Sequence, residues 1–227
     1  MPKLFTAFVA TAVAAIVASL SGPALFLVYA LLKPLATVLV IAQAWRRGIP
    51  GDARRRALLC GLALSLVGDV ALLWPAEGFL PGLVAFLLAH LAYLVGFTRG
   101  RRLAERKAPF VAYAAVAGVI LGLLWPGVPA PLRLPVRAYV ACLAAMAAQA
   151  AVGWWAQSGT TDAESLALAR RAAFGGALFM ASDALLATNR FALALPWSGL
   201  WILASYWAAQ WLIASSLPPR RRPLTSP

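Results

Sequence analysis

The sequence predicts an all-α protein, a polytopic bundle of eight transmembrane helices with both termini in the cytoplasm. Three observations predict this fold: the apolar composition, the length of the apolar runs, and the uneven distribution of charge between loops. Hydrophobic residues make up 63% of the 227 residues and charged residues 12%, whereas soluble domains average about 45–50% and about 25%. A chain of this composition is suited to a lipid bilayer, and most soluble folds are excluded.

A helix that crosses a hydrocarbon core about 30 Å thick needs about 20 apolar residues. The apolar runs of about this length cover roughly residues 4–20, 24–45, 57–74, 79–98, 108–125, 136–155, 172–188 and 197–217. In chain order, the charged, proline or glycine residues that end these runs are Gly22, Arg46, Pro75, Arg99, Pro126, Gly159, Arg190 and Pro218. No long linker separates the runs, so residues 1–227 are predicted to form a single transmembrane domain. The first run is long for a signal peptide and follows a single lysine, which favours a retained helix.

Basic residues alternate strongly between the two sides of the predicted bundle. The loops at residues 46–56 and 99–107 each contain five Lys or Arg. With Lys3, the pair at 170–171 and the three arginines at 220–222, sixteen of the twenty basic residues lie on one side. The other side has three basic residues, and Lys33 lies inside a predicted span. The positive-inside rule therefore places this basic side, with both termini, in the cytoplasm.

The formal net charge of +13 follows from this topology and does not indicate nucleic-acid binding. The basic loops lack the interleaved aromatic residues of a nucleic-acid surface, and they favour anionic headgroups of membrane lipids as partners. Arginine outnumbers lysine 17 to 3, and alanine and leucine are abundant, which is typical of a GC-rich bacterial genome. We therefore expect a multi-pass protein of the bacterial cytoplasmic membrane.

Four ionisable residues lie inside the predicted spans: Lys33, Asp69, His90 and Asp183. Such residues cost about 2.5–3.5 kcal/mol each at mid-helix even on the lowest scales, so they are expected to face the protein interior. At 1.5 Å per residue they all fall about 12–18 Å from the cytoplasmic helix ends. The polar residues at similar depth are Tyr29, Tyr93, Tyr206 and Gln210. The sequence therefore predicts one shared polar cavity within the membrane.

Each of these residues also has a structural interpretation. Lys33 with either aspartate would form an ion pair that fixes the register of the helices. His90, Tyr93 and Gln210 would form hydrogen bonds between helices, and Arg190 would extend its guanidinium to the membrane interface. Two carboxylates, a lysine and a histidine at one depth nevertheless exceed what helix packing requires, which favours a functional cavity.

Several chemistries are excluded by missing motifs. The chain has no glycine-rich phosphate loop, no G-x-S-x-G sequence, no H-E-x-x-H sequence and no Cys/His cluster with metal-ligand spacing. A single histidine argues against a Ser-His-Asp triad and against a multi-histidine metal centre. We therefore expect no cofactor and no metal, and carboxylate chemistry inside the membrane is what the sequence supports.

Five short motifs resemble one known family along nearly the whole chain. They are Lys33-Pro34, Gly68-Asp69, His90-x-x-Tyr93, Tyr206-Trp207-x-x-Gln210, and the run Ser182-Asp183 through Asn189-Arg190-Phe191. Together they resemble the YhhN family of integral membrane proteins, whose animal members are lysoplasmalogenases. The Ser-Asp…Asn-Arg-Phe run is the most specific motif. Trp207 is a departure, because a second tyrosine is expected there.

The resemblance implies hydrolysis of the vinyl ether bond of a lysoplasmalogen, with release of a fatty aldehyde and a glycerophospho-alcohol. Cleaving a vinyl ether requires an acid and a base, and the two aspartates, Asp69 and Asp183, are the expected pair, in either assignment. Lys33 would hold the lipid phosphate or favour ionisation of one aspartate. The residues expected to orient water and the headgroup of the lysophospholipid substrate are His90, Asn189, Arg190, Tyr206 and Gln210.

Two other functions fit the same residues. Paired intramembrane carboxylates with a lysine also suit a proton-coupled transporter of a small molecule or lipid. A membrane scaffold would use the polar residues only to hold helices together. The very short outer loops leave little room for two halves of a transporter to move. The hydrolase is therefore the favoured hypothesis.

Overall fold

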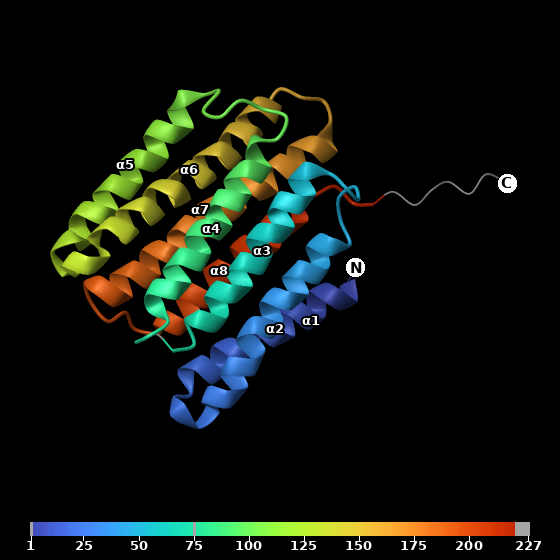
Figure 1. Cartoon of the computed structure of the whole chain (residues 1–227). Coiled ribbons are helices and arrows are strands. Elements are labelled where there is room, and N and C mark those ends of the chain that lie inside the picture. The colour runs from blue at the N-terminus through green and yellow to red at the C-terminus, as the bar shows by residue number, and fades with distance from the viewer. Residues whose placement is uncertain (1, 75, 221–227) are drawn as a thin grey trace.

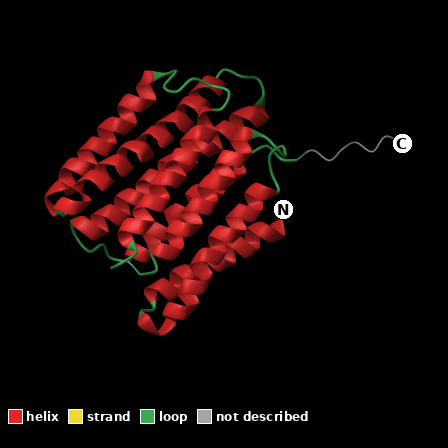
Figure 2. Ribbon diagram, viewed as in Figure 1, coloured by secondary structure: helices red, strands yellow, loops and turns green. Residues whose placement is uncertain are grey.

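The structure is a computed structural model, and it describes residues 2–74 and 76–220. Across these residues the chain forms eight α-helices and no β-strand (Figure 2). The helices are α1 (Pro2–Leu20), α2 (Phe26–Trp45), α3 (Ala53–Ala71), α4 (Phe79–Thr98), α5 (Lys107–Leu124), α6 (Arg133–Gln157), α7 (Ala163–Phe191) and α8 (Ser198–Ser215). Short 3-10 helices precede α2 at Pro23–Leu25 and connect α5 to α6 at Trp125–Gly127 and Ala130–Leu132. The all-α prediction is confirmed.

The helices differ from the predicted runs mainly where capping residues extend them beyond the apolar segment. α7 begins at Ala163 rather than near residue 172, because the side chain of Asp162 accepts hydrogen bonds from the backbone N–H groups of Glu164 and Ser165. α3 begins four residues before position 57, where Asp52 caps the backbone N–H of Arg55. Apolar runs indicate the hydrocarbon span, whereas capped helices continue past it.

Among the residues that the structure describes, five helical segments are long and apolar enough to cross a membrane: Lys3–Leu20, Pro23–Trp45, Phe79–Thr98, Lys107–Gly127 and Ala130–Gln157. The other three helices, α3, α7 and α8, are less apolar because they contain many of the polar residues described below. The most exposed large side chains include Leu27, Leu31 and Leu123, each more than 70% exposed. An apolar outer surface of this kind is what lipid contact requires, and the chain is a multi-pass membrane protein.

Six of the helices form a ring around a shared interior. In order of contact, the ring is α2, α3, α4, α6, α7 and α8, and α8 closes it against α2. Outside the ring, α1 packs against α2 and α8, and α5 packs mainly against α6, so these two helices lie on opposite flanks of the molecule (Figure 1). The interior of the ring contains the polar residues, while the outer helices widen the apolar surface.

Two glycines on α3 allow α4 to approach closely. A Cβ atom added at Gly61 would collide with the ring of Tyr93, and one added at Gly68 would collide with the ring of Phe86. Both aromatic side chains are buried. The glycine of the Gly68-Asp69 motif therefore has a packing role, since it admits an aromatic ring beside the aspartate.

The loops rich in basic residues gather at one end of the bundle, where α1 begins and α8 ends (Figure 1). There, Arg47 after α2 donates to the carbonyl oxygens of Leu217 and Ser215, and Arg171 on α7 also donates to Ser215. These bonds satisfy carbonyl groups at the end of α8 that have no partner within the helix. We refer to this end as the basic end and to the other as the outer end.

Candidate active site

Asp69 lies at the centre of a polar network between α2, α3 and α8. Its Oδ2 accepts hydrogen bonds from Thr37 Oγ1 at 2.6 Å and from Tyr206 OH at 2.8 Å. Its Oδ1 is 3.9 Å from Lys33 Nζ, and both side chains are at most 5% exposed. We call Lys33, Thr37, Asp69 and Tyr206 the Asp69 network. Asp69 is thus held by two hydroxyl donors and a buried ammonium.

The spacing of the sequence accounts for this arrangement. Lys33 and Thr37 are four residues apart, so they share one face of α2. Thr37 also accepts a hydrogen bond from Trp207 Nε1 at 3.3 Å. The indole at position 207 therefore has a partner that fixes it beside the network, and the departure from tyrosine is accommodated in the interior.

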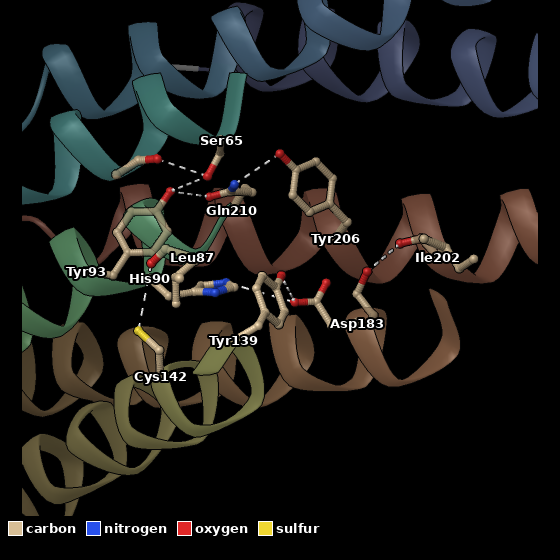
Figure 3. Close-up of polar contacts among 12 residues, drawn as sticks. Ser65, Leu87, His90, Tyr93, Tyr139, Cys142, Asp183, Ile202, Tyr206 and Gln210 are labelled. Carbon is tan, nitrogen blue, oxygen red and sulfur yellow. Dashed lines mark hydrogen bonds and ion pairs between the residues drawn. The ribbon is translucent and has the colours of Figure 1, made fainter. Parts of the chain in front are cut away.

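A chain of hydrogen bonds extends the network to α4. Gln210 Nε2 donates to Tyr206 OH at 3.1 Å, and Tyr93 OH donates to Gln210 Oε1 at 2.7 Å. Ser65 Oγ lies 3.3 Å from Tyr93 OH and donates to the backbone of Gly61. Figure 3 shows this chain of contacts from Ser65 through Tyr93 and Gln210 to Tyr206. All four side chains are buried, and such connected chains hold helices in one arrangement.

Asp183 belongs to a second group, between α4, α6 and α7. Tyr139 OH donates to Asp183 Oδ2 at 2.6 Å, and His90 Nε2 is 4.0 Å from the same oxygen. The imidazole ring also contacts the rings of Tyr139 and Phe179, with centroids 5.1 and 4.6 Å away. We call His90, Tyr139 and Asp183 the Asp183 group (Figure 3).

His90 is fully enclosed, and neither of its ring nitrogens has a hydrogen-bond partner among the described residues. Buried polar atoms without a partner are rare, and each one requires an explanation. The Oδ2 atom of Asp183 lies 4.0 Å from Nε2, beyond hydrogen-bond distance. Catalytic hydrogen bonds are often long in an empty site and shorten in the reacting complex.

An apolar cavity opens beside the Asp183 group. Its walls come from α4, α5, α6 and α7, and the space in it that no protein atom fills is about 830 Å³, which includes space open to the surroundings. Asp183 and Tyr139 are the polar side chains among its lining residues, and the rest include Phe79, Phe86, Leu121, Met180 and Phe191. A long apolar ligand bound here would meet one carboxyl and one phenol.

The structure does not place the four ionisable residues in one cavity. Asp183 lines this cavity, whereas Lys33, Asp69 and His90 are not among its lining residues. Tyr206 lies between the two groups: its hydroxyl bonds to Asp69, and its ring packs against Phe86 and Phe179. The prediction of one shared cavity is therefore wrong. Equal depth along the helices does not require that two side chains face the same space.

The remaining predicted residues lie at the edges of these groups. Asn189 Oδ1 accepts the backbone N–H of Leu195 at 2.9 Å, so it shapes the turn between α7 and α8. Arg190 is exposed, and its guanidinium lies 4.8 Å from the ring centre of Phe79, a residue of the cavity wall. Tyr29 is partly buried, and its ring centre lies 5.8 Å from Lys33 Nζ. Of the two predicted cations, Lys33 and Arg190, only Arg190 contacts a wall residue of the apolar cavity.

The sequence profile of the YhhN family matches residues 28–217. The chain belongs to the YhhN family. The lysoplasmalogenase TMEM86A of Homo sapiens is 32% identical over 170 residues, which cover 74% of this chain and 67% of the human protein. The human lysoplasmalogenase TMEM86B is 34% identical over 182 residues, covering 78% and 70%. A lysoplasmalogenase of Mycobacterium bovis is 32% identical over 186 residues, covering 75% and 67%. No solved structure matches the chain.

The segment that matches the YhhN family contains both groups, because Lys33 to Gln210 lie inside it. Sequence reasoning missed Tyr139, Thr37 and Ser65. A signal was present for Tyr139, since it lies in the outer turn of α6 at nearly the depth of Asp183 on α7. Across residues 2–74 and 76–220, no three His, Cys, Asp or Glu side chains gather in a way that could hold a metal ion.

Proposed function

We propose that this chain is a membrane-embedded lysoplasmalogenase, which hydrolyses the vinyl ether bond of a lysoplasmalogen to a fatty aldehyde and a glycerophospho-alcohol. The observation that carries the proposal is the position of Asp183, a carboxyl that faces an apolar cavity with Tyr139 bonded to it and His90 beside it. The names of the relatives support the same reaction, and the transporter alternative is not favoured.

The cavity suits the alkenyl chain of such a lipid. Its wall is apolar except for Asp183 and Tyr139, so burial of the hydrocarbon chain would provide most of the binding energy. The vinyl ether would be the one part of the chain that meets a polar group. Arg190, at the same end as Phe79, would contact the phosphate in the headgroup region.

Proton transfer to carbon is the first step. Asp183 donates its proton to the outer alkene carbon, the electrons of the double bond form the new C–H bond, and the ether oxygen stabilises the resulting oxocarbenium ion. Tyr139 OH then stabilises the carboxylate that remains, through its 2.6 Å bond to Oδ2. Glycosidases stabilise a related cation with an ionised carboxylate.

Water capture completes the reaction. A water molecule attacks the oxocarbenium carbon and gives up a proton to the Asp183 carboxylate, with His90 placed to orient this water or share the proton. The hemiacetal then collapses to the aldehyde and the free alcohol of the glycerophospho-alcohol. One carboxyl thus acts first as the acid and then as the base, as the acid residue does in retaining glycosidases.

Asp69 has a supporting role in this proposal. It is enclosed at 1% exposure, and Tyr206 separates it from the rings of the cavity side. Its partner Lys33 is also buried, at 4% exposure, and is not available to a lipid phosphate. The Asp69 network would fix Tyr206, and through it Phe86 and Phe179, which pack against the cavity and against His90.

Hydrolysis in heavy water tests the function. The purified protein, supplied with a lysoplasmalogen, should release an aldehyde that contains one solvent deuterium on the carbon next to the carbonyl. In water labelled with heavy oxygen, the label should enter the aldehyde during hydrolysis. Exchange of oxygen between free aldehyde and water is measured separately as a control. The saturated alkyl ether analogue, which has no alkene to protonate, should not react. Release of a fatty acid from ester analogues, with the vinyl ether left intact, would overturn the proposal.

We further propose that the chain forms a single transmembrane domain in a bacterial cytoplasmic membrane, with the basic end inside. The support is the distribution of sixteen of the twenty basic residues in loops and tails of one side. Reporter fusions after residues 50, 104 and 160 should report cytoplasm, and fusions near 77, 130 and 194 the opposite side. A fusion from either set that reports the other side of the membrane contradicts the orientation.

A further inference from the structure

A second cavity lies at the basic end, among the ends of α3, α4, α6 and α7. Its polar lining residues are Arg54, Arg99, Arg101, Gln149, Gln157 and Ser165. No carboxylate is among its lining residues. We call this space the arginine cavity. It therefore brings together three guanidinium groups and no opposite charge.

The arginines of this cavity, which are partly or fully exposed, differ from the two buried arginines of the basic end. Arg47 and Arg55 each donate two side-chain hydrogen bonds to backbone carbonyl oxygens. Within the described residues, the guanidinium groups of Arg54, Arg99 and Arg101 form no hydrogen bond or ion pair. Arg54 Nε is buried without a partner. An unpartnered buried donor is unfavourable, which points to a missing acceptor.

The loop that supplies two of the arginines is held in place. Gln149 is fully buried on α6, where its Oε1 accepts the backbone N–H of Ala104 and its Nε2 donates to the carbonyl oxygen of Arg102. The loop between α4 and α5 therefore passes over α6, as Figure 1 shows. Arg106 stacks on Trp155 of the same helix, 5.4 Å from the ring centre. These contacts hold the loop that contains Arg99 and Arg101 against α6.

The electrostatics of the cavity favour an anion. Burial is the main cause that lowers the pKa of the Arg54 guanidinium, and the like charge of Arg101 lowers this pKa by less than Asp52 raises it. Asp52 attracts Arg54, but its carboxylate caps α3 through Arg55 N–H and does not line the cavity. An anion bound between the guanidinium groups would relieve the repulsion and accept the unpartnered N–H groups.

The arginine cavity is separate from the candidate active site. Asp183 lines the apolar cavity, and Ala172, the nearest residue of α7 that lines the arginine cavity, is eleven residues away on the same helix. At 1.5 Å per residue this separation is about 16 Å. The vinyl ether of a lysoplasmalogen lies only a few bonds from its phosphate, so a lipid with its phosphate in the arginine cavity cannot reach Asp183.

We propose that the arginine cavity binds a phosphate group, from either an anionic lipid headgroup or a free phosphate compound. Guanidinium groups match phosphate oxygens in charge and geometry, and several converging on one space are typical of phosphate recognition. Gln157 supplies a neutral donor among the lining residues, whereas the hydroxyl of Ser165 already donates to the carboxylate of Asp162. The site does not depend on the hydrolase function, and a phosphate bound there stabilises the folded protein from the basic end.

Thermal unfolding of the full chain in a neutral detergent tests the proposal. The two probes are inorganic phosphate, compared with chloride at equal ionic strength, and phosphatidylglycerol, compared with phosphatidylcholine, in mixed micelles. A ligand that binds the folded state raises the unfolding temperature with a saturating dependence on its concentration. The variants are Arg54→Gln and Arg101→Gln. Arg56→Gln is the matched control, because Arg56 is exposed on the same helix and lies outside the cavity.

We expect saturable stabilisation of the wild type and of Arg56→Gln, with a Kd at least about tenfold higher in each cavity variant, the effect of one lost charge-assisted contact. Stabilisation by inorganic phosphate identifies a free phosphate ligand, and stabilisation by phosphatidylglycerol alone identifies a lipid headgroup. The proposal is overturned if neither probe stabilises beyond its control, or if all four proteins respond equally. Because the measurement is independent of hydrolysis, its failure does not affect the proposed reaction.

Discussion

The two intramembrane aspartates have opposite surroundings. Asp69 accepts two hydrogen bonds, lies beside a buried lysine and is 1% exposed. Asp183 has one hydroxyl donor within the described residues, a histidine at 4.0 Å, and an apolar cavity in front of it. A carboxylate with all its partners in place stabilises a fold, whereas a carboxyl that faces open apolar space can react with a ligand. We therefore propose two different roles for the same residue type at the same depth.

Replacing Asp183 with asparagine should have the largest effect on turnover. The substitution retains the shape and the acceptor for Tyr139 but removes the transferable proton, and loss of a general acid costs about 10²–10⁴-fold. We expect kcat for aldehyde release to fall by that factor, with nearly unchanged thermal stability. The rate of aldehyde release in a single turnover measures the loss of catalysis. Near-normal turnover in this variant would falsify the assignment of Asp183.

Replacing Asp69 with asparagine should show the reverse pattern. It leaves the buried ammonium of Lys33 without its carboxylate, and breaking a buried ion pair costs about 3 kcal/mol or more. We expect a large loss of unfolding free energy in detergent, but a fall in turnover per folded molecule smaller than the Asp183→Asn loss.

The double variant Asp69→Asn/Lys33→Met serves as the control for this interpretation. It removes the unpaired charge, so stability should recover in large part. A stable Asp69→Asn variant without turnover would instead make Asp69 a catalytic residue, and the two aspartates would no longer differ in role.

Replacing Tyr139 with phenylalanine should have an intermediate effect. The change removes the 2.6 Å hydrogen bond to Asp183, and one hydrogen bond to a charged group corresponds to about tenfold or somewhat more in rate. We expect kcat to fall by this factor with little change in KM, because the phenol acts on the carboxylate formed during reaction. Tyr113→Phe on α5 is the matched control and should retain full turnover. Equal losses in both variants contradict the role of Tyr139.

Replacing Ser182 with alanine should have the smallest effect. Ser182 precedes Asp183 in the family motif, but its Oγ donates to the carbonyl oxygen of Ile202 at 3.0 Å and so connects α7 to α8. Loss of one neutral hydrogen bond corresponds to about 1 kcal/mol of stability. Turnover should not change. A large fall in kcat at unchanged stability would extend the reactive region beyond the Asp183 group.

Part of the site could be predicted from the sequence because residues four apart share a helix face. Tyr29 with Lys33, and Tyr206 with Gln210, illustrate this regularity. Tyr139 could not be assigned to Asp183 in the same way, since they lie on different helices and their contact depends on how α6 rotates against α7. Asn189 was predicted to orient the substrate, but its side chain bonds to the backbone of Leu195, a turn contact that the motif alone does not reveal.

The sequence by itself determined that the chain is a bundle of apolar helices, and it determined how deep each polar residue lies. Both follow from counting residues, because each adds 1.5 Å along the axis and each span must match the bilayer. Only the tertiary structure decided which helices meet, and so which residues become partners. The rotation of each helix depends on contacts with several neighbours at once, such as Gly68 against Phe86. That rotation turns Asp69 towards Lys33 and Tyr206, and Asp183 towards Tyr139 and the apolar cavity.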